Sequence, residues 1–204
     1  MEQVQNYIST LQQTMNKLHQ PLISEVIHLL QRARMQGNQI FIMGNGGSSS
    51  TASHFVCDLA KNTRYDGLPH FRAIGLTDNM EIFSAYANDE GYENVFSQQL
   101  TNLIRADDIV IAISTSGNSP NVVNAVHEAQ KHNATTIGFT GFDGGSLGQM
   151  VDIHIHVDSN VIEHIEDIHL MLEHMIVRVI KDQPMIGISL IGTSEMISAD
   201  VLGD

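Results

Sequence analysis

The chain has 204 residues and a formal net charge of −13, with only 10 Lys and Arg residues. Affinity for a nucleic-acid backbone depends on clustered cationic side chains, so this charge balance argues against a nucleic-acid partner. A hydrophobic content of 42% supports one good core at this length. We expect a single domain over residues 1–182, followed by a tail, 183–204, whose role the sequence does not indicate.

The single cysteine, Cys57, excludes an internal disulfide and fits a reducing compartment. We expect it to be a small buried residue. The segment Met1–Gln20 is amphipathic and lacks the apolar core of a signal peptide, and no apolar run approaches the roughly 20 residues of a membrane span. These features predict a soluble, cytoplasmic protein without a membrane partner.

Apolar residues recur at helical spacing in two stretches at the start of the chain. The first contains Val4, Tyr7, Ile8, Leu11, Met15 and Leu18, and the second, after Pro21, contains Leu22, Ile23, Val26, Ile27, Leu30 and Ala33. Together they predict an N-terminal helical hairpin over residues 1–36. The apolar stripes of such a hairpin need a covering surface, and a partner chain supplies one. We therefore expect a homo-oligomer.

Short apolar segments then alternate with helical patterns. Strands are predicted at Ile40–Met43, Phe71–Thr77, Asp108–Ile113, Thr135–Thr140 and Asp152–Val157. The clearest helices are Asn94–Ile104, Pro120–His132 and the long Val161–Lys181. This alternation predicts an α/β fold with a doubly wound, five-stranded parallel sheet flanked by helices. Ligands of such folds bind beyond the carboxyl ends of the strands.

A glycine-rich turn, Gly44–Gly47, connects the first predicted strand to a hydroxyl-rich helix start, Ser48–Thr51. Such a turn lets backbone N–H groups approach an anion closely, and the helix dipole favours negative charge there. Further along the same helix, His54 and Asp58 are four residues apart and share one face. The unit therefore combines a candidate phosphate anchor with two side chains able to bind a metal or act on a carbonyl.

A second loop, STSGNS (Ser114–Ser119), directly follows the strand Asp108–Ile113. Ser119 and Pro120 form the N-cap and first-turn proline of a helix. Four hydroxyls thus surround the positive end of a helix, which favours a phosphate cradle over a capped turn with solvated hydroxyls. The chain has no GxxxxGK[ST] motif, so hydrolysis of a nucleoside triphosphate is not supported.

These motifs resemble the sugar isomerase (SIS) domain family. The resemblance rests on GNGGS (Gly44–Ser48), His54-Phe55, AND (Ala87–Asp89), STSGNS, and IEDIH (Ile165–His169) followed by His174, and it runs in register from about residue 1 to 181. It implies the SIS fold and a homotetramer formed through helical packing, with an active site that subunits could share. The implied activity is aldose–ketose isomerisation of sedoheptulose 7-phosphate to a heptose 7-phosphate through a metal-stabilised enediolate.

The resemblance also assigns residues to roles. Substrate binding falls on Asn45, Gly46, Gly47, Asn88 and Asp89, and phosphate binding on Ser114, Thr115, Ser116 and Ser119. The metal positions fall on His54, Asp58, Glu166 and His174, with one Zn²⁺ expected per active site. Of these, Asp58, Glu166 and His174 are the implied catalytic residues.

Two of these positions depart from the family pattern, which has Glu at position 58 and Gln at position 166. A Glu-to-Asp change withdraws the carboxylate by roughly one methylene, and a displacement of about 1 Å can cost on the order of a hundredfold in rate. The base is therefore Asp58 or Glu166. We favour Asp58, which shares a helix face with His54, and expect His174 to be the acid or proton shuttle.

Glu166 and His174 are eight residues apart, about 12 Å along a straight helix. They can meet at one ion only by reaching toward each other or by coming from different subunits. The other histidines of the segment, His164 and His169, are unassigned, and His154 and His156 are expected to be structural.

The main alternative is a non-catalytic module of the same family that binds a phosphosugar or the replication initiator. A sugar-phosphate lyase or sensor built on the same cradle is a further possibility. Two other motifs are weak: Gly44, Gly46 and Ser49 only approximate a dinucleotide-binding turn. The GxSxG match at Gly144–Gly148 does not directly follow its strand and is expected to be a glycine-rich loop.

Overall fold

A computed structural model describes residues 1–188, which contain a five-stranded, all-parallel sheet in the order β2-β1-β3-β4-β5. The strands are β1 (Gln39–Gly44), β2 (Arg72–Gly75), β3 (Ile109–Ile113), β4 (Thr135–Thr140) and β5 (Ile153–His156). Four of them lie within a segment predicted as a strand, and β1 extends one residue beyond its predicted segment at each end. The predicted doubly wound sheet is thus confirmed.

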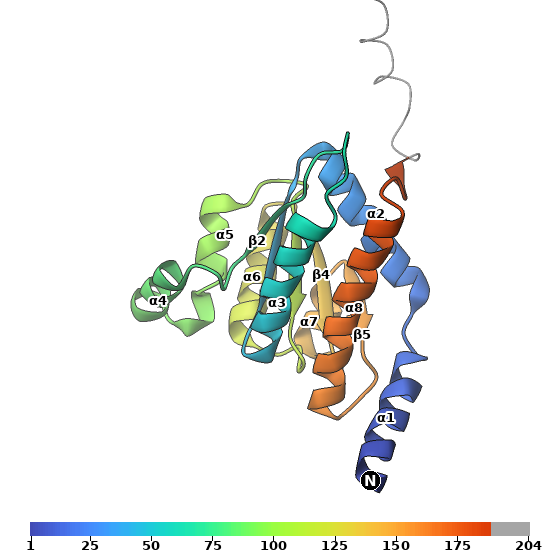
Figure 1. Ribbon diagram of the computed structural model, residues 1–204. Coiled ribbons are helices and arrows are strands. Elements are labelled where there is room, and N and C mark those ends of the chain that lie inside the picture. Colours follow the sequence, from blue (N-terminus) through green and yellow to red (C-terminus); the bar gives the residue numbers. More distant parts are fainter. Residues whose placement is uncertain (189–204) are drawn as a thin grey trace, which may run out of the picture.

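Helices cover both faces of this sheet (Figure 1). The α-helices of residues 1–188 are α1 (Glu2–Met15), α2 (Gln20–Gln36), α3 (Gly47–Cys57), α4 (Met80–Asp89), α5 (Ser97–Leu103), α6 (Pro120–Lys131), α7 (Gly145–Met150) and α8 (Ile162–Asp182). A π-helical turn, Asp58–Asn62, extends α3, and a 3₁₀ turn, Tyr92–Asn94, precedes α5. Helices α4 and α7 were not predicted: the glycine-rich stretch at Gly144–Gly148 enters α7 at Gly145.

The alternation of side chains along β1 divides the core into two layers. Ile40 and Ile42 point to the face covered by α2, α3 and α8, whereas Phe41 and Met43 point to the face covered by α5 and α6. All four side chains are fully buried, as expected for a central parallel strand. Helices α3 and α8 therefore share one apolar layer and contact each other over it.

The strand order places the ends of β1 and β3 side by side, with Gly44 in register with Ile113. The buried carboxylate of Asp108 stabilises the opposite ends of these strands, accepting hydrogen bonds from the backbone N–H groups of Gln39 (2.7 Å) and Arg105 (2.8 Å). After β1 the chain continues to β2 on one side of this pair, whereas after β3 it continues to β4 on the other side. This is the topological switch point where open α/β sheets bind ligands.

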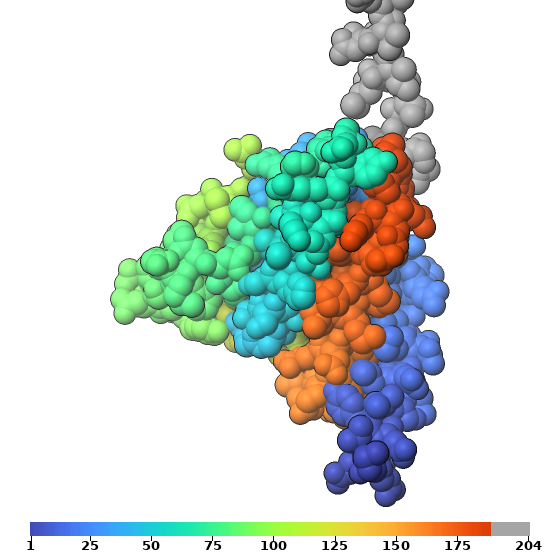
Figure 2. All heavy atoms as spheres, in the orientation of Figure 1, coloured from blue at the N-terminus to red at the C-terminus, as the bar shows by residue number. Residues whose placement is uncertain are grey.

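The N-terminal helices differ in how well they are covered. Helix α2 packs on the core, whereas α1 leads away from the rest of the fold (Figures 1 and 2) and buries only Thr14. Its Val4 and Ile8 side chains are 60% and 50% exposed. No helix in residues 1–188 is long and apolar enough to cross a bilayer.

The predicted tail, 183–204, is described only for residues 183–188, and its remainder lies outside the described residues. The carbonyl of Pro184 accepts a hydrogen bond from the buried amide of Gln31 on α2 (2.9 Å), and Ile186 packs against the core. These first residues after α8 therefore fold back onto α2.

The buried imidazole of His169 on α8 makes the stability of the fold depend on pH. Burial lowers the pKa of His169 from 6.5 to about 4, against a smaller opposite effect of the Thr140 backbone. The unfolded chain therefore binds more protons between these pH values, and stability falls as the pH drops from 6.5 to 4. The shift corresponds to roughly 3 kcal/mol. We expect His169→Gln to flatten this dependence in urea unfolding measured across the range.

The matched control is His127→Gln, because His127 is exposed on α6. It should leave the pH dependence as in the wild type. An unchanged acid slope in His169→Gln would contradict the assignment.

Candidate functional site

The loop after β1 needs glycine where its backbone packs closely against neighbouring atoms. A Cβ at Gly44 would lie 2.7 Å from the Ser48 backbone, so the first turn of α3 packs directly on this residue. Gly46 occupies the N-cap position of α3 with φ +54° and provides no capping side chain. The first backbone N–H groups of α3 therefore remain available to an anion.

Hydrogen bonds connect this loop to the start of α6. Asn45 and Asn121 exchange two side-chain hydrogen bonds of 2.8 Å each, and the hydroxyl of Tyr92 donates to the Asn45 carbonyl oxygen (3.0 Å). The two loops at the switch point thus form one connected unit, with Asn45 at its centre.

The STSGNS loop turns sharply at Gly117, which has φ +65° and packs so closely on the Gly144 carbonyl that no Cβ fits. The hydroxyls of Ser114 and Ser119 lie 3.2 Å apart, and that of Ser116 accepts from the Asn118 backbone N–H (3.2 Å). Ser119 occupies the N-cap position of α6, as predicted, but its side chain makes no capping hydrogen bond. Its hydroxyl is therefore not committed to the helix end.

Helices α3 and α8 bring four metal-ligating side chains together. His54, Asp58, Glu173 and His174 each present one ligand atom within 4.8 Å of the others. The imidazole rings of His54 and His174 are 4.9 Å apart between centroids, and His54 Nε2 lies 3.7 Å from an Asp58 oxygen. Figure 2 shows the surfaces of α3 and α8 side by side.

Glu173 is the member of this group that the sequence analysis missed. Its side chain is 0% exposed, and neither carboxylate oxygen has a hydrogen-bond partner within residues 1–188. Burial, and then the nearby Asp58 carboxylate, raise the pKa of Glu173 to about 8. The sequence did contain a signal that could have identified Glu173: it is an acidic residue within the apolar stripe of α8. That stripe includes Ile165, His169, Leu172 and Ile176.

Asp58 lies at the point where α3 changes to a π-helical turn. The residue is largely buried, and its carboxylate accepts a hydrogen bond from the Asn62 amide (2.7 Å). A π-helical turn inside an α-helix is often associated with functional sites, because it redirects side chains. Here it orients Asp58 toward α8.

Glu166 does not join this group in the described chain. Its carboxylate lies against Gly47, where an added Cβ would come within 2.7 Å of a Glu166 oxygen. The structure therefore brings together His54, Asp58 and His174 of the four predicted metal positions, and places Glu166 beside the glycine loop.

The structure also bears on three further expectations, for Asn88 and Asp89, for Cys57 and for His154. Asn88 and Asp89, at the end of α4, are exposed and hydrogen-bond to each other (2.7 Å), with no hydrogen bond to the two loops among the described residues. Cys57 was expected to be buried but is exposed, because it ends α3 on the side away from the sheet. The structural role expected for His154 is supported by its 2.6 Å contact with the Thr140 hydroxyl.

The donor set of the α3–α8 group fits a divalent cation. Two imidazoles and two carboxylates are typical ligands of Zn²⁺. A fully buried carboxylate without a hydrogen-bond donor is costly unless a cation or a proton compensates it, and the oxygens of Glu173 meet this description. The residues present therefore fit a metal ion.

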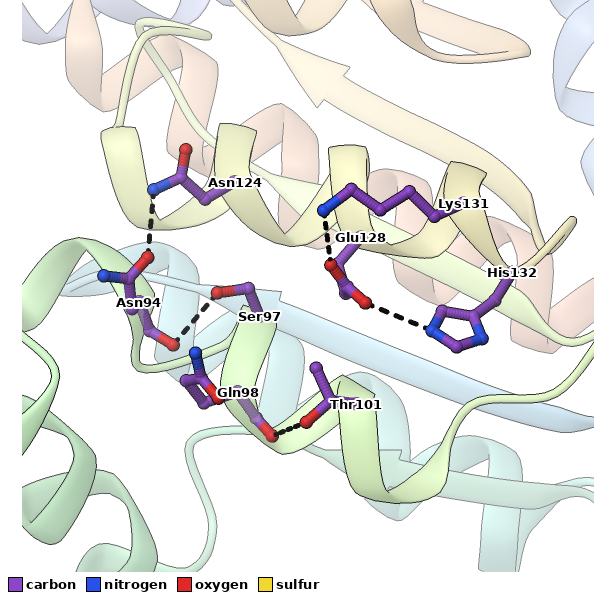
Figure 3. Close-up of polar contacts among 8 residues, drawn as sticks. All are labelled: Asn94, Ser97, Gln98, Thr101, Asn124, Glu128, Lys131 and His132. Carbon is purple, nitrogen blue, oxygen red and sulfur yellow. Dashed lines mark hydrogen bonds and ion pairs between the residues drawn. The ribbon is translucent and has the colours of Figure 1, made fainter.

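A polar groove lies elsewhere, between α5 and α6. It has a volume of about 670 Å³ and is lined by polar side chains, including Asn94, Ser97, Asn124 and Glu128. Figure 3 shows that the Glu128 carboxylate is already paired with Lys131 (2.9 Å) and His132 (3.1 Å). The pKa of Glu128 is lowered, and the hydrogen bond from Lys131 is the main cause. This groove thus has no uncompensated charge with which to select a ligand.

Comparisons with known proteins agree with this geometry. Residues 3–141 match the SIS domain family. The chain therefore belongs to the SIS-domain proteins.

Its relatives narrow the class further. The phosphoheptose isomerase of Aliarcobacter butzleri is 38% identical over 178 residues, covering 81% of this chain and 93% of that protein. The structures of phosphoheptose isomerase GmhA from Neisseria gonorrhoeae and of a phosphoheptose isomerase from Francisella tularensis superpose with TM-scores of 0.80 and 0.82. Both are 30% identical, covering 89% of this chain and 98% and 97% of theirs. Within the SIS-domain proteins, the chain belongs to the phosphoheptose isomerase family.

Proposed function

We propose that this protein is an aldose–ketose isomerase that converts sedoheptulose 7-phosphate to a heptose 7-phosphate. The observation that carries the proposal is the position of the His54, Asp58, Glu173 and His174 group on the same helix pair as the anion-binding loop. The names of the relatives support the choice of substrate.

The dimensions suit a seven-carbon sugar phosphate. His54 follows Gly47 by seven residues, so it lies about 10 Å further along α3. An extended chain advances about 1.2 Å per bond, and the eight bonds between C1 and phosphorus therefore span about 10 Å. A phosphate held at the loops would place the carbonyl end of the sugar near the two histidines.

Isomerisation requires two proton transfers, one between C1 and C2 and one between their oxygens. We assign the carbon transfer to Asp58, whose carboxylate removes a proton from C1 and returns it to C2. His174 then serves the oxygens, giving a proton to O2 as O1 loses one. Glu166 remains the alternative base.

We further propose that the reaction depends on a metal, with Zn²⁺ favoured by the donor set. His54, Asp58, His174 and a carboxylate of α8 would hold it. When bound, the ion supplies a Lewis acid that stabilises negative charge on the enediolate oxygens. Asp58 and Glu173 are largely buried, so bulk water is excluded from the side of the ion site that they form.

Loss of proton exchange tests the catalytic assignment. Wild-type protein incubated with sedoheptulose 7-phosphate in heavy water should incorporate deuterium next to the carbonyl. Asp58→Asn and His174→Ala should each slow this exchange by about a hundredfold or more, because they remove an acid–base group. Proton NMR of the sugar measures the rate.

The exposed Asp66 and His127 provide matched controls, and Asp66→Asn and His127→Ala should exchange normally. Wild-type protein that binds the sugar phosphate without any exchange would instead support a non-catalytic binding module.

Ser119 offers a test of phosphate binding that leaves the fold intact. Because its side chain makes no cap hydrogen bond, Ser119→Ala removes a hydroxyl from the loop with little cost to α6. The loss of one hydrogen bond to a charged group predicts a KM increase of about tenfold at unchanged kcat. Thr101→Ala, on the exposed side of α5, is the control. An unaltered KM in Ser119→Ala would remove this residue from the phosphate site.

We also propose a cytoplasmic homotetramer with active sites near subunit contacts. The exposed Val4 and Ile8 of α1 need a covering surface, and a groove of about 580 Å³ between α2 and α8 is bordered by His174. The exposed thiol of Cys57 fits a reducing compartment. Sedimentation should give four times the 22.5 kDa chain mass, and Ile8→Glu should lower it. A wild-type monomer would refute this assembly.

A further inference from the structure

We propose that Asn121 and Tyr92 are positioning residues for substrate binding: they fix the side-chain amide of Asn45 so that it meets the substrate only as a hydrogen-bond donor. Neither residue belongs to the substrate or metal positions expected from the sequence. The inference deepens the proposed function and rests on it, because it concerns the loops that would bind the sugar phosphate.

The start of α6 fixes the orientation of the Asn121 amide. Asn121 is the second residue of this helix, directly after Pro120, and is only 1% exposed. The backbone N–H of Val122 is shared between Asn121 Oδ1 and the Ser119 carbonyl oxygen, each 3.0 Å from the nitrogen. A backbone N–H can only donate, so the side-chain atom that faces it must be the amide oxygen.

The orientation of Asn121 determines that of Asn45. Asn121 Oδ1 also accepts a hydrogen bond from Asn45 Nδ2 (2.8 Å), so Asn45 must turn its own oxygen toward Asn121 Nδ2 (2.8 Å). The Tyr92 hydroxyl is a second donor to this oxygen (3.0 Å). An amide oxygen has two lone pairs, and both are used here, whereas Asn45 Nδ2 still has one N–H to donate.

A donor at this position suits a phosphorylated sugar. Asn45 is half-buried between Gly44 and Gly46, in the loop where the first backbone N–H groups of α3 are available. Its remaining N–H adds a side-chain donor to these backbone donors, and a phosphate or hydroxyl oxygen can accept it. A rotated amide would instead present its oxygen, which repels a phosphate. Because Asn121 approaches from α6 and Tyr92 from the 3₁₀ turn after α4, two separate elements prevent this rotation.

A double-mutant cycle tests whether the two residues act through Asn45. Asn45→Ala and Asn121→Ala should each raise KM for sedoheptulose 7-phosphate about tenfold at unchanged kcat, because each removes the oriented donor to a bound oxygen. The double variant should show the same increase as either single variant. Tyr92→Phe should raise KM about threefold in the wild type, because the Asn121 contacts remain, and should have no further effect in the Asn45→Ala background.

The chain offers a matched pair of the same residue types outside the two loops. The amide of Asn102 on α5 donates to the hydroxyl of Tyr86 on α4 (2.8 Å). Asn102→Ala and Tyr86→Phe should therefore leave KM and kcat as in the wild type. Circular dichroism verifies the folding of each variant. Asn121→Ser, which keeps a small polar residue in the first turn of α6, replaces Asn121→Ala if the alanine variant does not fold.

The orientation of Asn45 can also be measured without a ligand, from the side-chain amide resonances of ¹⁵N-labelled protein. The Asn45 amide, identified by its absence in Asn45→Ala, should give two separate proton signals, one of them protected from exchange with water by the bond to Asn121. Asn121→Ala should remove this protection and shift both signals, whereas Asn102→Ala should not.

An increase in KM of about a hundredfold in the double variant, the product of the two single effects, would overturn the proposal, because Asn121 would then act independently of Asn45. An unchanged KM or unchanged Asn45 resonances in a folded Asn121 variant would overturn it as well. If the wild type never exchanges deuterium with sedoheptulose 7-phosphate, the proposed reaction fails. The Asn45 resonances, and the same cycle measured as Kd by calorimetry, then decide the positioning role.

Discussion

The parallel packing of α3 against α8 is the constraint on which the candidate site depends. Both helices bury their apolar stripes against the same face of the sheet, so their orientation is fixed by the core. This packing brings carboxylates from two helices, Asp58 and Glu173, to one buried space. Two like charges there are unfavourable in the absence of a proton or a cation. A bound cation would therefore offset the electrostatic repulsion between these two carboxylates, whose positions are set by the fold.

The sheet topology supplies the second half of the site. Because β1 and β3 are neighbours in register, the loops that follow them meet, and the paired amides of Asn45 and Asn121 join them. Helix α3 begins in the first of these loops and ends at Cys57, with Asp58 as its C-cap. One helix therefore spans the distance between an anion-binding end and an ion-binding end, and its length determines the size of substrate that can contact both.

Much of this arrangement could be predicted from local sequence. The apolar runs gave the strands, and glycine followed by hydroxyl residues gave both loops, because each pattern has a direct backbone cause. Position 173 was not predicted for a different reason. Whether a glutamate in an apolar stripe faces solvent or a second carboxylate depends on the neighbouring helix, and periodicity on α8 contains no information about α3. The exposure of Cys57 and the presence of helix α4 were not predicted either, because both depend on tertiary context.

The shortened side chain at position 58 can be understood from the same packing. Aspartate keeps its carboxylate about one methylene closer to the α3 backbone than glutamate would. In this chain, Glu173 extends a longer side chain toward Asp58 from α8, and Asp58 begins the π-helical turn that follows α3. Two carboxylates, one from each helix, therefore face the two histidines. Glu166 lies beside Gly47, at the other end of the helix pair.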